Sequence, residues 1–182
     1  MKHLFLIILF YLFSQVGSLA NERDLRLNQL FYELKVNKAK VAAIVEQEIW
    51  TLWSTHPTDE KLTVRLEEGS QFVRNQQLNK ARDIFTEVIQ LDQNWAEAWN
   101  KRATVFYMMG EFKKSQDDID KVLTLEERHF GALAGQGLVN IRLKNFEKAI
   151  RSYKQAQEIY PSMRSPEIMI RQIEELMKQQ TI

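Results

Sequence analysis

Residues 130–163 read FGALAGQGLVNIRLKNFEKAIRSYKQAQEIYPSM, and two related units of the same length precede them without a gap, at 62–95 and 96–129. The three units repeat their small and apolar positions in phase. The clearest positions are the eighth (Gly69, Ala103, Gly137), the twentieth (Ala81, Ser115, Ala149) and the twenty-fourth (Phe85, Ile119, Tyr153). A period of 34 residues is typical of a helical solenoid, whose units bury their apolar faces only against neighbouring units. The register therefore predicts a stack of helix pairs.

Each unit divides into two helical blocks with a break near its fifteenth residue. At the break of the second unit, Gly110 suits the left-handed backbone that ends many helices. The first unit has Gln76 there, and the third has Lys144 and Asn145, of which Asn tolerates the same backbone. Small residues at positions eight and twenty should let the two helices of a unit approach closely, with aromatic side chains filling the remaining space.

The repeated positions resemble those of the tetratricopeptide repeat (TPR) family. In the third unit the matching residues are Leu133, Gly137, Leu143, Phe146, Ala149, Tyr153, Ala156 and Pro161. In the second unit they are Trp99, Ala103, Phe106, Gly110, Phe112, Ser115, Val122 and Leu125. The resemblance implies an all-α fold, a right-handed α-solenoid of three helix pairs, within residues 58–163. It also implies a role in protein–protein contact.

Segments on both sides of the repeats carry helical patterns of their own. Two apolar stripes at helical spacing consist of Leu27, Leu30, Phe31 and Leu34, and then of Val41, Val45, Ile49 and Leu52. The second stripe ends at His56-Pro57, because the residue before proline is pushed out of helical geometry. Residues 21–57 therefore predict a helical hairpin, expected to cap the apolar end of the stack. Residues 164–182 predict a one-sided capping helix with Ser165 as its N-cap.

The first twenty residues have a different character. Lys2 is followed by an apolar run over 4–13, and the segment ends in Ser18-Leu19-Ala20, with small residues where a signal peptidase reads. This layout predicts a secretory signal peptide over residues 1–20, cleaved after Ala20. The alternative is an uncleaved membrane anchor, although the apolar run is shorter than the about 20 residues that span a bilayer.

Composition narrows the classes of partner and the compartment. Loss of residues 1–20 removes Lys2 and no acid, which leaves 24 basic residues (25 − 1) against 24 acidic ones. A neutral chain has no long-range field that would draw it to nucleic acid or to an anionic membrane. The absence of Cys excludes disulfides and thiolate chemistry. An exported protein without Cys favours the bacterial periplasm over a eukaryotic secretory route.

The sequence holds little that points to catalysis. Only His56 and His129 remain after removal of the signal segment, and neither has a metal-ligand spacing to another His. No Ser has a base positioned beside it. We therefore expect no catalytic, cofactor-binding or metal-binding residue, and we assign the pairs Trp50/Trp53 and Trp95/Trp99 to packing.

One repeated position departs from the family pattern. The seventh residue, often Leu, is here Glu68, Arg102 and Gln136. This polar row could set partner specificity, or it could form internal salt bridges that fix how the helices stack. The second interpretation is favoured, because charges that face a core are usually paired. Arg102 could reach Asp118 on the second helix of its own unit or Glu68 on the preceding unit.

The resemblance also implies where a partner would lie. In the TPR family the first helix of each unit lines a concave groove, mainly through positions two, five, nine, twelve and thirteen. On this sequence these are Thr63, Leu66, Ser70, Val73 and Arg74, then Glu97, Asn100, Thr104, Tyr107 and Met108, then Gly131, Ala134, Leu138, Ile141 and Arg142. The residues selected for partner contact are Arg74, Asn100, Lys101, Thr104, Tyr107, Leu138, Ile141 and Arg142. Such a mildly apolar groove suits an extended peptide or a partner helix.

Some family members hold a C-terminal carboxylate with Asn, Lys and Arg from three units. Only Asn100 and Lys101 resemble that clamp, since Gly131, Ala134 and Gly135 occupy the corresponding places of the third unit.

Three functional hypotheses follow. The whole layout resembles small exported TPR proteins of Gram-negative bacteria, which implies a scaffold or adaptor in the cell envelope. Such an adaptor would bind a protein or peptide through its groove, with no cofactor, no nucleic acid and no membrane span in the mature form. The second hypothesis is a structural module that self-associates into a homo-oligomer without a groove ligand. The third is an enzyme or enzyme subunit.

Overall fold

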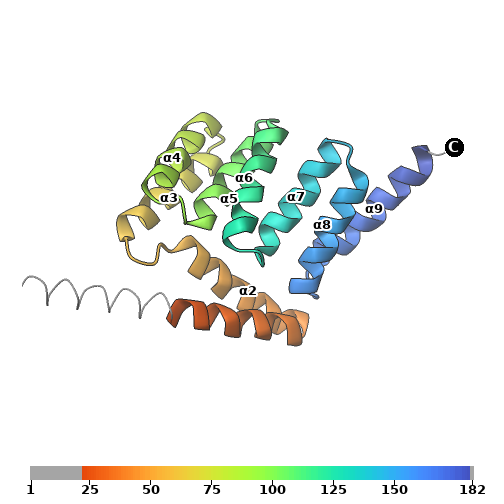
Figure 1. The fold of residues 1–182 in the computed structure, drawn as a ribbon, viewed down its shortest axis with the longest axis horizontal. Coiled ribbons are helices and arrows are strands. Elements are labelled where there is room, and N and C mark those ends of the chain that lie inside the picture. Colours follow the sequence, from red (N-terminus) through yellow and green to blue (C-terminus); the bar gives the residue numbers. More distant parts are fainter. Residues whose placement is uncertain (1–21, 181–182) are drawn as a thin grey trace, which may run out of the picture.

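The computed structural model describes residues 22–180, so the expected signal segment over 1–20 lies outside the described residues. A helix over residues 22–36, called here the N-terminal helix, comes first. It is followed by α2 (Ala39–Ser54), α3 (Glu60–Arg74), α4 (Leu78–Leu91), α5 (Ala96–Met108), α6 (Phe112–Leu125), α7 (Phe130–Arg142), α8 (Phe146–Ile159) and α9 (Arg164–Gln180) (Figure 1). The described residues contain no strand. The all-α solenoid of three helix pairs, with a helical hairpin before it and one helix after it, is thus confirmed.

The helix pairs stack in sequence order and curve in one direction. Each helix from α3 to α9 packs mainly against its neighbours in the chain. The first helices also contact each other, α3 with α5 and α5 with α7, whereas the second helices make no comparable contacts with one another. A stack in which only the first helices touch must curve with α3, α5 and α7 on its inner side. This inner side is the concave face.

The three breaks within the units share one backbone geometry. Gln76, Gly110 and Lys144 all have positive φ, at 57°, 79° and 60°. In each turn the next residue's N–H donates to a carbonyl five residues earlier, as from Gln77 to Phe72 at 2.8 Å. This is the Schellman helix ending, which satisfies otherwise unpaired carbonyls. In the third unit the left-handed residue is Lys144 and not Asn145, so the expectation based on Asn was wrong by one residue.

Close contact between the two helices of a unit depends on the eighth and twenty-fourth positions. A Cβ added to Gly69 would lie 2.4 Å from the Phe85 ring, and one added to Gly137 would lie 2.5 Å from the Tyr153 ring. The second unit has Ala103 facing the smaller Ile119 in the same places. Aromatic rings therefore occupy the space that glycine leaves, as the repeat pattern predicted.

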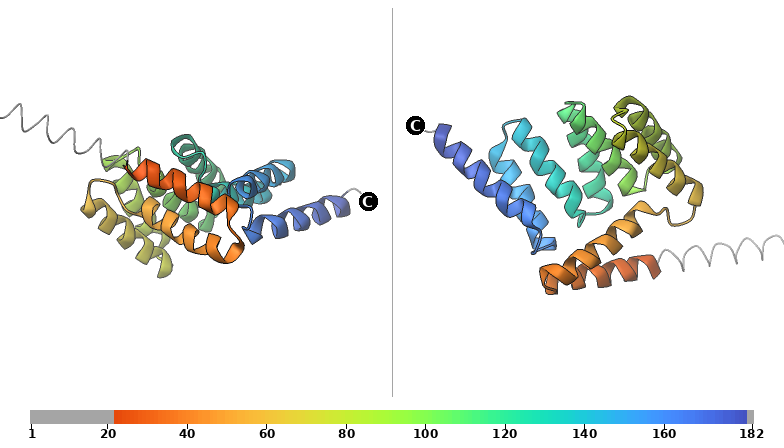
Figure 2. Two further views of the ribbon diagram at one scale, coloured as in Figure 1. Left: turned by 90° about the horizontal axis from the view of Figure 1, so that it is seen from below. Right: turned by 180° about the vertical axis from the view of Figure 1, so that it is seen from behind.

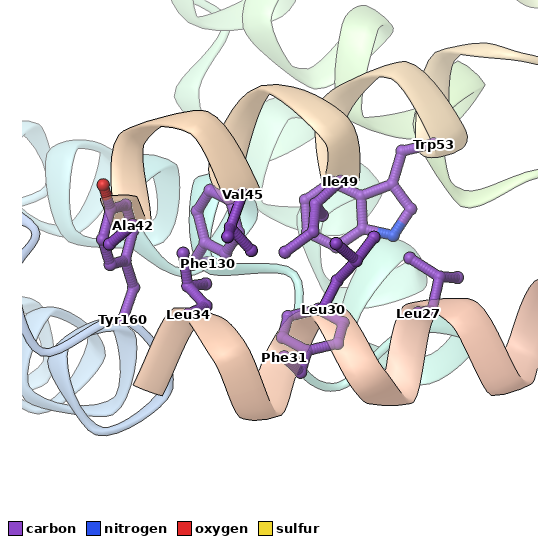
Figure 3. Close-up of a cluster of buried hydrophobic side chains, with 10 residues drawn as sticks. All are labelled: Leu27, Leu30, Phe31, Leu34, Ala42, Val45, Ile49, Trp53, Phe130 and Tyr160. Carbon is purple, nitrogen blue, oxygen red and sulfur yellow. The ribbon is translucent and has the colours of Figure 1, made fainter. Parts of the chain in front are cut away.

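The N-terminal hairpin does not cap the α3 end of the stack. Figure 1 shows the N-terminal helix and α2 along one edge of the stack, beneath α5 to α8, and Figure 2 shows the same arrangement from below and behind. α2 contacts α5, and the hairpin's buried cluster includes Phe130 of α7 and Tyr160 after α8 (Figure 3). The expectation of an end cap was therefore wrong. The exposed side of α3 needs little cover, because it carries mainly charged and polar residues around Val64.

The second helix of the hairpin buries Val45 and Ile49 of the expected stripe, with Leu52 partly buried beside them, but not Val41. Its buried residues are Ala42, Val45, Ile49 and Trp53, while Val41 is exposed. Figure 3 shows these side chains directed toward Leu27, Leu30 and Leu34 of the N-terminal helix. The Trp95 indole N–H donates to the Trp53 carbonyl at 2.8 Å, which ties the end of α2 to the residue that precedes α5.

The last helix packs on the third unit as a one-sided element. Ile173 is buried against Ala149 and Tyr153, with Met169 and Ile170 beside it. Ile168 and Leu176 of the same helix are exposed. The helix begins at Arg164, so Ser165 lies inside the first turn and is not the N-cap.

Candidate functional site

A shallow hollow on the concave face brings together four of the eight expected partner-contact residues. Asn100, Thr104 and Tyr107 of α5 and Leu138 of α7 all line it, and its volume is about 80 Å³. Thr104 is exposed, and Tyr107 is half-buried with its ring centroid 5.6 Å from that of Phe112. These four residues therefore share one surface, as a groove between neighbouring units requires. Whether they contact a partner stays a prediction.

A larger cavity of about 420 Å³ lies where the hairpin meets the concave face. Its walls come from three helices, with Trp50, Thr51, Ser54 and Thr55 from the end of α2, Thr63, Leu66, Glu67 and Ser70 from α3, and Lys101 from α5. The hydroxyl protons on this wall are used locally, since Thr51 donates to the Gln47 carbonyl and Ser70 to the Leu66 carbonyl. The sequence did not predict this cavity, because half of its wall belongs to the hairpin.

With Lys101 in the larger cavity, five of the eight expected partner-contact residues line one of the two cavities, and the other three line neither. The Arg74 guanidinium donates to Glu67 at 2.6 Å on the surface of α3. Ile141 packs with the cluster formed by α8 and α9, and the Arg142 guanidinium lies over the Phe112 ring at 4.7 Å from its centroid. The structure therefore does not gather all eight residues into one site.

Glu97, at a position expected to line the groove, is instead fully buried. Its carboxylate accepts a hydrogen bond from Asn100 at 3.0 Å and lies 3.1 Å from the Lys101 ammonium. The other partner is the His129 Nε2 atom, at 3.1 Å. Asn100 and Lys101 thus each line a cavity and also contact the one buried carboxylate beneath it.

The contacts of His129 define its protonation. Its Nδ1 atom accepts the N–H of Ala132 at the start of α7, so Nε2 carries the proton and donates it to Glu97. The ring is stacked on Trp53 with centroids 3.9 Å apart. Burial alone would raise the pKa of Glu97, but the hydrogen bond from His129 and the charge of Lys101 outweigh burial and hold that pKa below its usual value. The histidine links α5, α7 and the hairpin.

The other histidine is also a structural link. His56 Nε2 lies 2.9 Å from Asp92, and its Nδ1 accepts the N–H of Asp59 at 2.9 Å. Within residues 22–180, no group of three or more His, Asp or Glu side chains could hold a metal ion. Both histidines fix the ends of helices.

Among residues 22–180, no helix is long and apolar enough to cross a bilayer.

The polar row behaves as an internal feature at two of its three positions. Arg102 donates twice to Asp118, both times at 2.8 Å, which confirms the pairing within its own unit. Burial raises the pKa of Asp118 even though Arg102 opposes that shift. The Gln136 side chain accepts from Ser152 at 2.8 Å. Glu68 differs, because it pairs with Arg65 near the surface and not with Arg102.

One residue in the sequence carried a signal for the contact between hairpin and stack. Gly131 occupies a groove position, and a Cβ there would lie 2.5 Å from the Trp50 ring. A glycine at a position that should face a ligand indicates that something large already packs there. Here it is Trp50, which covers the start of α7 and shortens the open groove at that edge.

Comparison with known proteins finds relatives that contain tetratricopeptide repeats. A family model described as a tetratricopeptide repeat matches residues 131–163. A TPR repeat-containing protein of Rhizobium etli is 30% identical over 151 residues, which cover 82% of this chain and 74% of that protein. Human sperm-associated antigen 1 is 23% identical over 121 residues, which cover 66% of this chain and only 13% of that longer protein.

Solved structures resemble this one at low sequence identity. The first TPR domain of Spaghetti (RPAP3), bound to an HSP90 peptide, has a TM-score of 0.63 at 19% identity and covers 65% of this chain and 94% of its own. The crystal structure of MamA has a TM-score of 0.60 at 19% identity and covers 75% of this chain and 77% of its own. At these identities the likeness concerns the fold alone.

Proposed function

Because this chain belongs to the tetratricopeptide repeat family, we propose that it is an interaction module that holds a protein segment in its concave groove. The observation that carries the proposal is the pair of hollows on one face, of about 80 and about 420 Å³, on the inner side of the curved stack. Extended peptides and single helices fit such concave, mildly apolar surfaces.

The chemistry of the walls favours an uncharged segment over an acidic chain end. The one cation on the larger cavity, Lys101, is already paired with the buried Glu97, and Asn100 donates to the same carboxylate. A carboxylate ligand would have to break these contacts and leave the buried Glu97 with His129 as its remaining partner, which is costly. Trp50 instead offers apolar area, and the hydroxyl oxygens around it can accept hydrogen bonds. The occupant would therefore present apolar or N–H-bearing side chains.

Groove binding is tested by photocrosslinking in the cells that make the protein. A photoreactive amino acid replaces Thr104, which is exposed in the groove, or Leu91, which is exposed on the outer helix α4. We expect a discrete crosslinked protein from position 104 and none from position 91. The same products from both positions would remove the groove from the proposal, and crosslinks to a second copy alone would favour the self-associating module.

A groove variant provides the matched binding test. Leu138→Arg adds a charge to the hollow at a partly exposed position, so helicity should be kept while crosslinking from position 104 falls at least tenfold. Leu91→Arg, at a more exposed leucine on α4, serves as the control and should leave crosslinking unchanged.

Export to the cell envelope is the second part of the proposal. Its support is the layout of the first twenty residues, a basic start, an apolar run and small residues before Asn21. The chain recovered from the envelope fraction should begin at Asn21. A chain that keeps Met1 in that fraction would favour the membrane anchor, and recovery from the cytoplasm would contradict export.

A further inference from the structure

The hairpin carries an apolar surface that nothing within residues 22–180 covers. Leu25, Tyr32 and Val36 of the N-terminal helix are exposed by 61, 69 and 59%. They recur at spacings of seven and four residues, so they lie along one side of the helix, roughly opposite Leu30 and Leu34, which are buried. Three large apolar side chains are therefore exposed on the outer side of this helix, next to the exposed Gln29, although a solvated helix face is normally polar.

The apolar surface continues across the turn of the hairpin. Val41 and Ile44, in the first two turns of α2, are exposed by 47 and 68%. Tyr32 and Val36 lie one helical turn apart before the connection at 37–38, and Val41 and Ile44 lie one turn apart after it. These four residues, with the lysines among them, are called here the hairpin tip. Figure 1 shows the turn at the end of the hairpin that points away from α3.

The hairpin tip is locally basic although the chain as a whole is neutral. Lys35, Lys38 and Lys40 are all exposed. Within the described residues none of them forms an ion pair, because the nearby acids are engaged elsewhere. The Glu33 carboxylate accepts from Gln29 at 2.9 Å, and the Glu46 carboxylate accepts from Tyr160 at 3.0 Å. Three lysines that form no ion pair among the described residues thus lie among four exposed apolar side chains.

We propose that the hairpin tip rests on the surface of an anionic lipid bilayer. Lysine is depleted from the centres of protein–protein interfaces, whereas apolar side chains flanked by lysine are typical of segments that lie in the headgroup region. Each lysine near an anionic surface strengthens the attraction, while the apolar side chains enter the boundary between headgroups and acyl chains. A second copy of the chain fits less well, because it would bring two sets of three lysines together.

The neutral net charge defines how this contact works. With no long-range field, the protein is not steered to the membrane from a distance, and the attraction acts only within about one Debye length of the tip, about 8 Å at physiological salt. The outer side of the N-terminal helix faces away from α2. The bilayer would therefore lie on the side of the hairpin that is opposite the repeats (Figure 1). The groove on α3, α5 and α7 would then stay accessible to its own partner.

The absence of Cys allows the contact to be located in the full chain. The variant Ile44→Cys is labelled with a polarity-sensitive fluorophore, and Val64→Cys, at an exposed valine of α3, is the control. Vesicles of phosphatidylcholine with phosphatidylglycerol should shift the Ile44 label to the blue and leave the Val64 label unchanged. The shift should disappear in about 1 M salt, where the Debye length is about 3 Å.

Each other outcome would overturn the proposal in a recognisable way. A chain that binds vesicles only through its apolar run over 4–13 would shift neither label. Equal shifts with pure phosphatidylcholine would remove the role of the lysines. A shift of the Ile44 label that depends on protein concentration and needs no vesicles would identify a second copy of the chain as the occupant.

A charge variant tests the lysines directly. The triple variant Lys35→Gln, Lys38→Gln and Lys40→Gln should weaken the vesicle affinity reported by the Ile44 label on the order of a hundredfold, since each lysine contributes about fivefold. The control is Lys113→Gln, Lys148→Gln and Lys154→Gln, the same change in charge at exposed lysines of α6 and α8. Equal losses in both triples would mean that total charge, and not the hairpin tip, governs binding.

Discussion

Charged side chains buried among the repeats act in pairs that join separate helices. Glu97 of α5 is bonded to His129 at the start of α7, and Arg102 of α5 is bonded to Asp118 of α6. An ion pair inside a protein adds little net stability, because desolvation offsets most of the attraction between the charges. Removing one member is costly, however, since the other stays buried alone. These pairs therefore fix how the helices are placed more than how stable they are.

The charge of Glu97 should make stability depend on pH. Its pKa in the folded protein lies below the ordinary value of 4.5, so the ionised form stabilises the fold above about pH 4.5 and this contribution is lost as the pH falls through the folded pKa. Glu97→Gln should lose about 1–3 kcal/mol of unfolding free energy near neutral pH, and less as the pH approaches about 3. Urea denaturation across that range is the measurement. Glu67→Gln, in an exposed pair with Arg74, should cost less than about 1 kcal/mol throughout.

The pair of Arg102 and Asp118 should show strong coupling. Arg102→Leu leaves the buried Asp118 without its cation and should destabilise the protein by about 3–5 kcal/mol. The double variant Arg102→Leu with Asp118→Leu should recover most of that loss, because no unpaired charge remains. A double-mutant cycle by urea denaturation measures the coupling. Losses that simply add would mean that the two side chains contribute independently.

At the scale of elements, the contact between the two helices of a unit is set by what faces the eighth position. Gly69 faces Phe85 and Gly137 faces Tyr153, whereas Ala103 is matched with Ile119. The size of one residue compensates for the size of the other, so the distance between helices is kept while the side chains differ. The tight Schellman turns also keep the two helices of a unit close together, because the hydrogen bonds of each turn fix the short connection between them.

Two glycines of α7 should therefore respond in opposite ways to the same substitution. Gly137→Ala places a Cβ 2.5 Å from the Tyr153 ring and should destabilise the third unit by about 1–3 kcal/mol. Gly135→Ala places a Cβ 3.7 Å from Ile119, an ordinary contact, and should stabilise the helix by up to about 1 kcal/mol. Thermal unfolding of both variants is the check. Similar melting temperatures for the two would contradict the packing described for position eight.

At the scale of the whole molecule, the sequence predicted the helices and missed the contacts that occur only once. The register placed α3 to α8 because each unit supplies its own apolar spacing and its own turn. No period marks the contact of Trp53 with His129 or of Trp50 with Gly131, so the position of the hairpin could not follow from the pattern. The groove prediction was incomplete for the same reason. Asn100 and Lys101 line the two cavities as expected, but their contacts with the buried Glu97 could not be read from the repeat pattern.

The contact between hairpin and stack can be separated from the stability of the stack itself. Gly131→Ala places a Cβ 2.5 Å from the Trp50 ring, at the place where α2 covers the start of α7. We expect amide hydrogen exchange in residues 22–54 to rise at least tenfold, a local opening of at least about 1.4 kcal/mol, while α8 and α9 keep their protection. Gly135→Ala, on the same helix and away from the hairpin, is the matched control and should leave exchange in residues 22–54 unchanged. Uniform loss of protection in the Gly131 variant would mean that hairpin and repeats unfold as one unit, and unchanged exchange in the hairpin would mean that Trp50 does not anchor it.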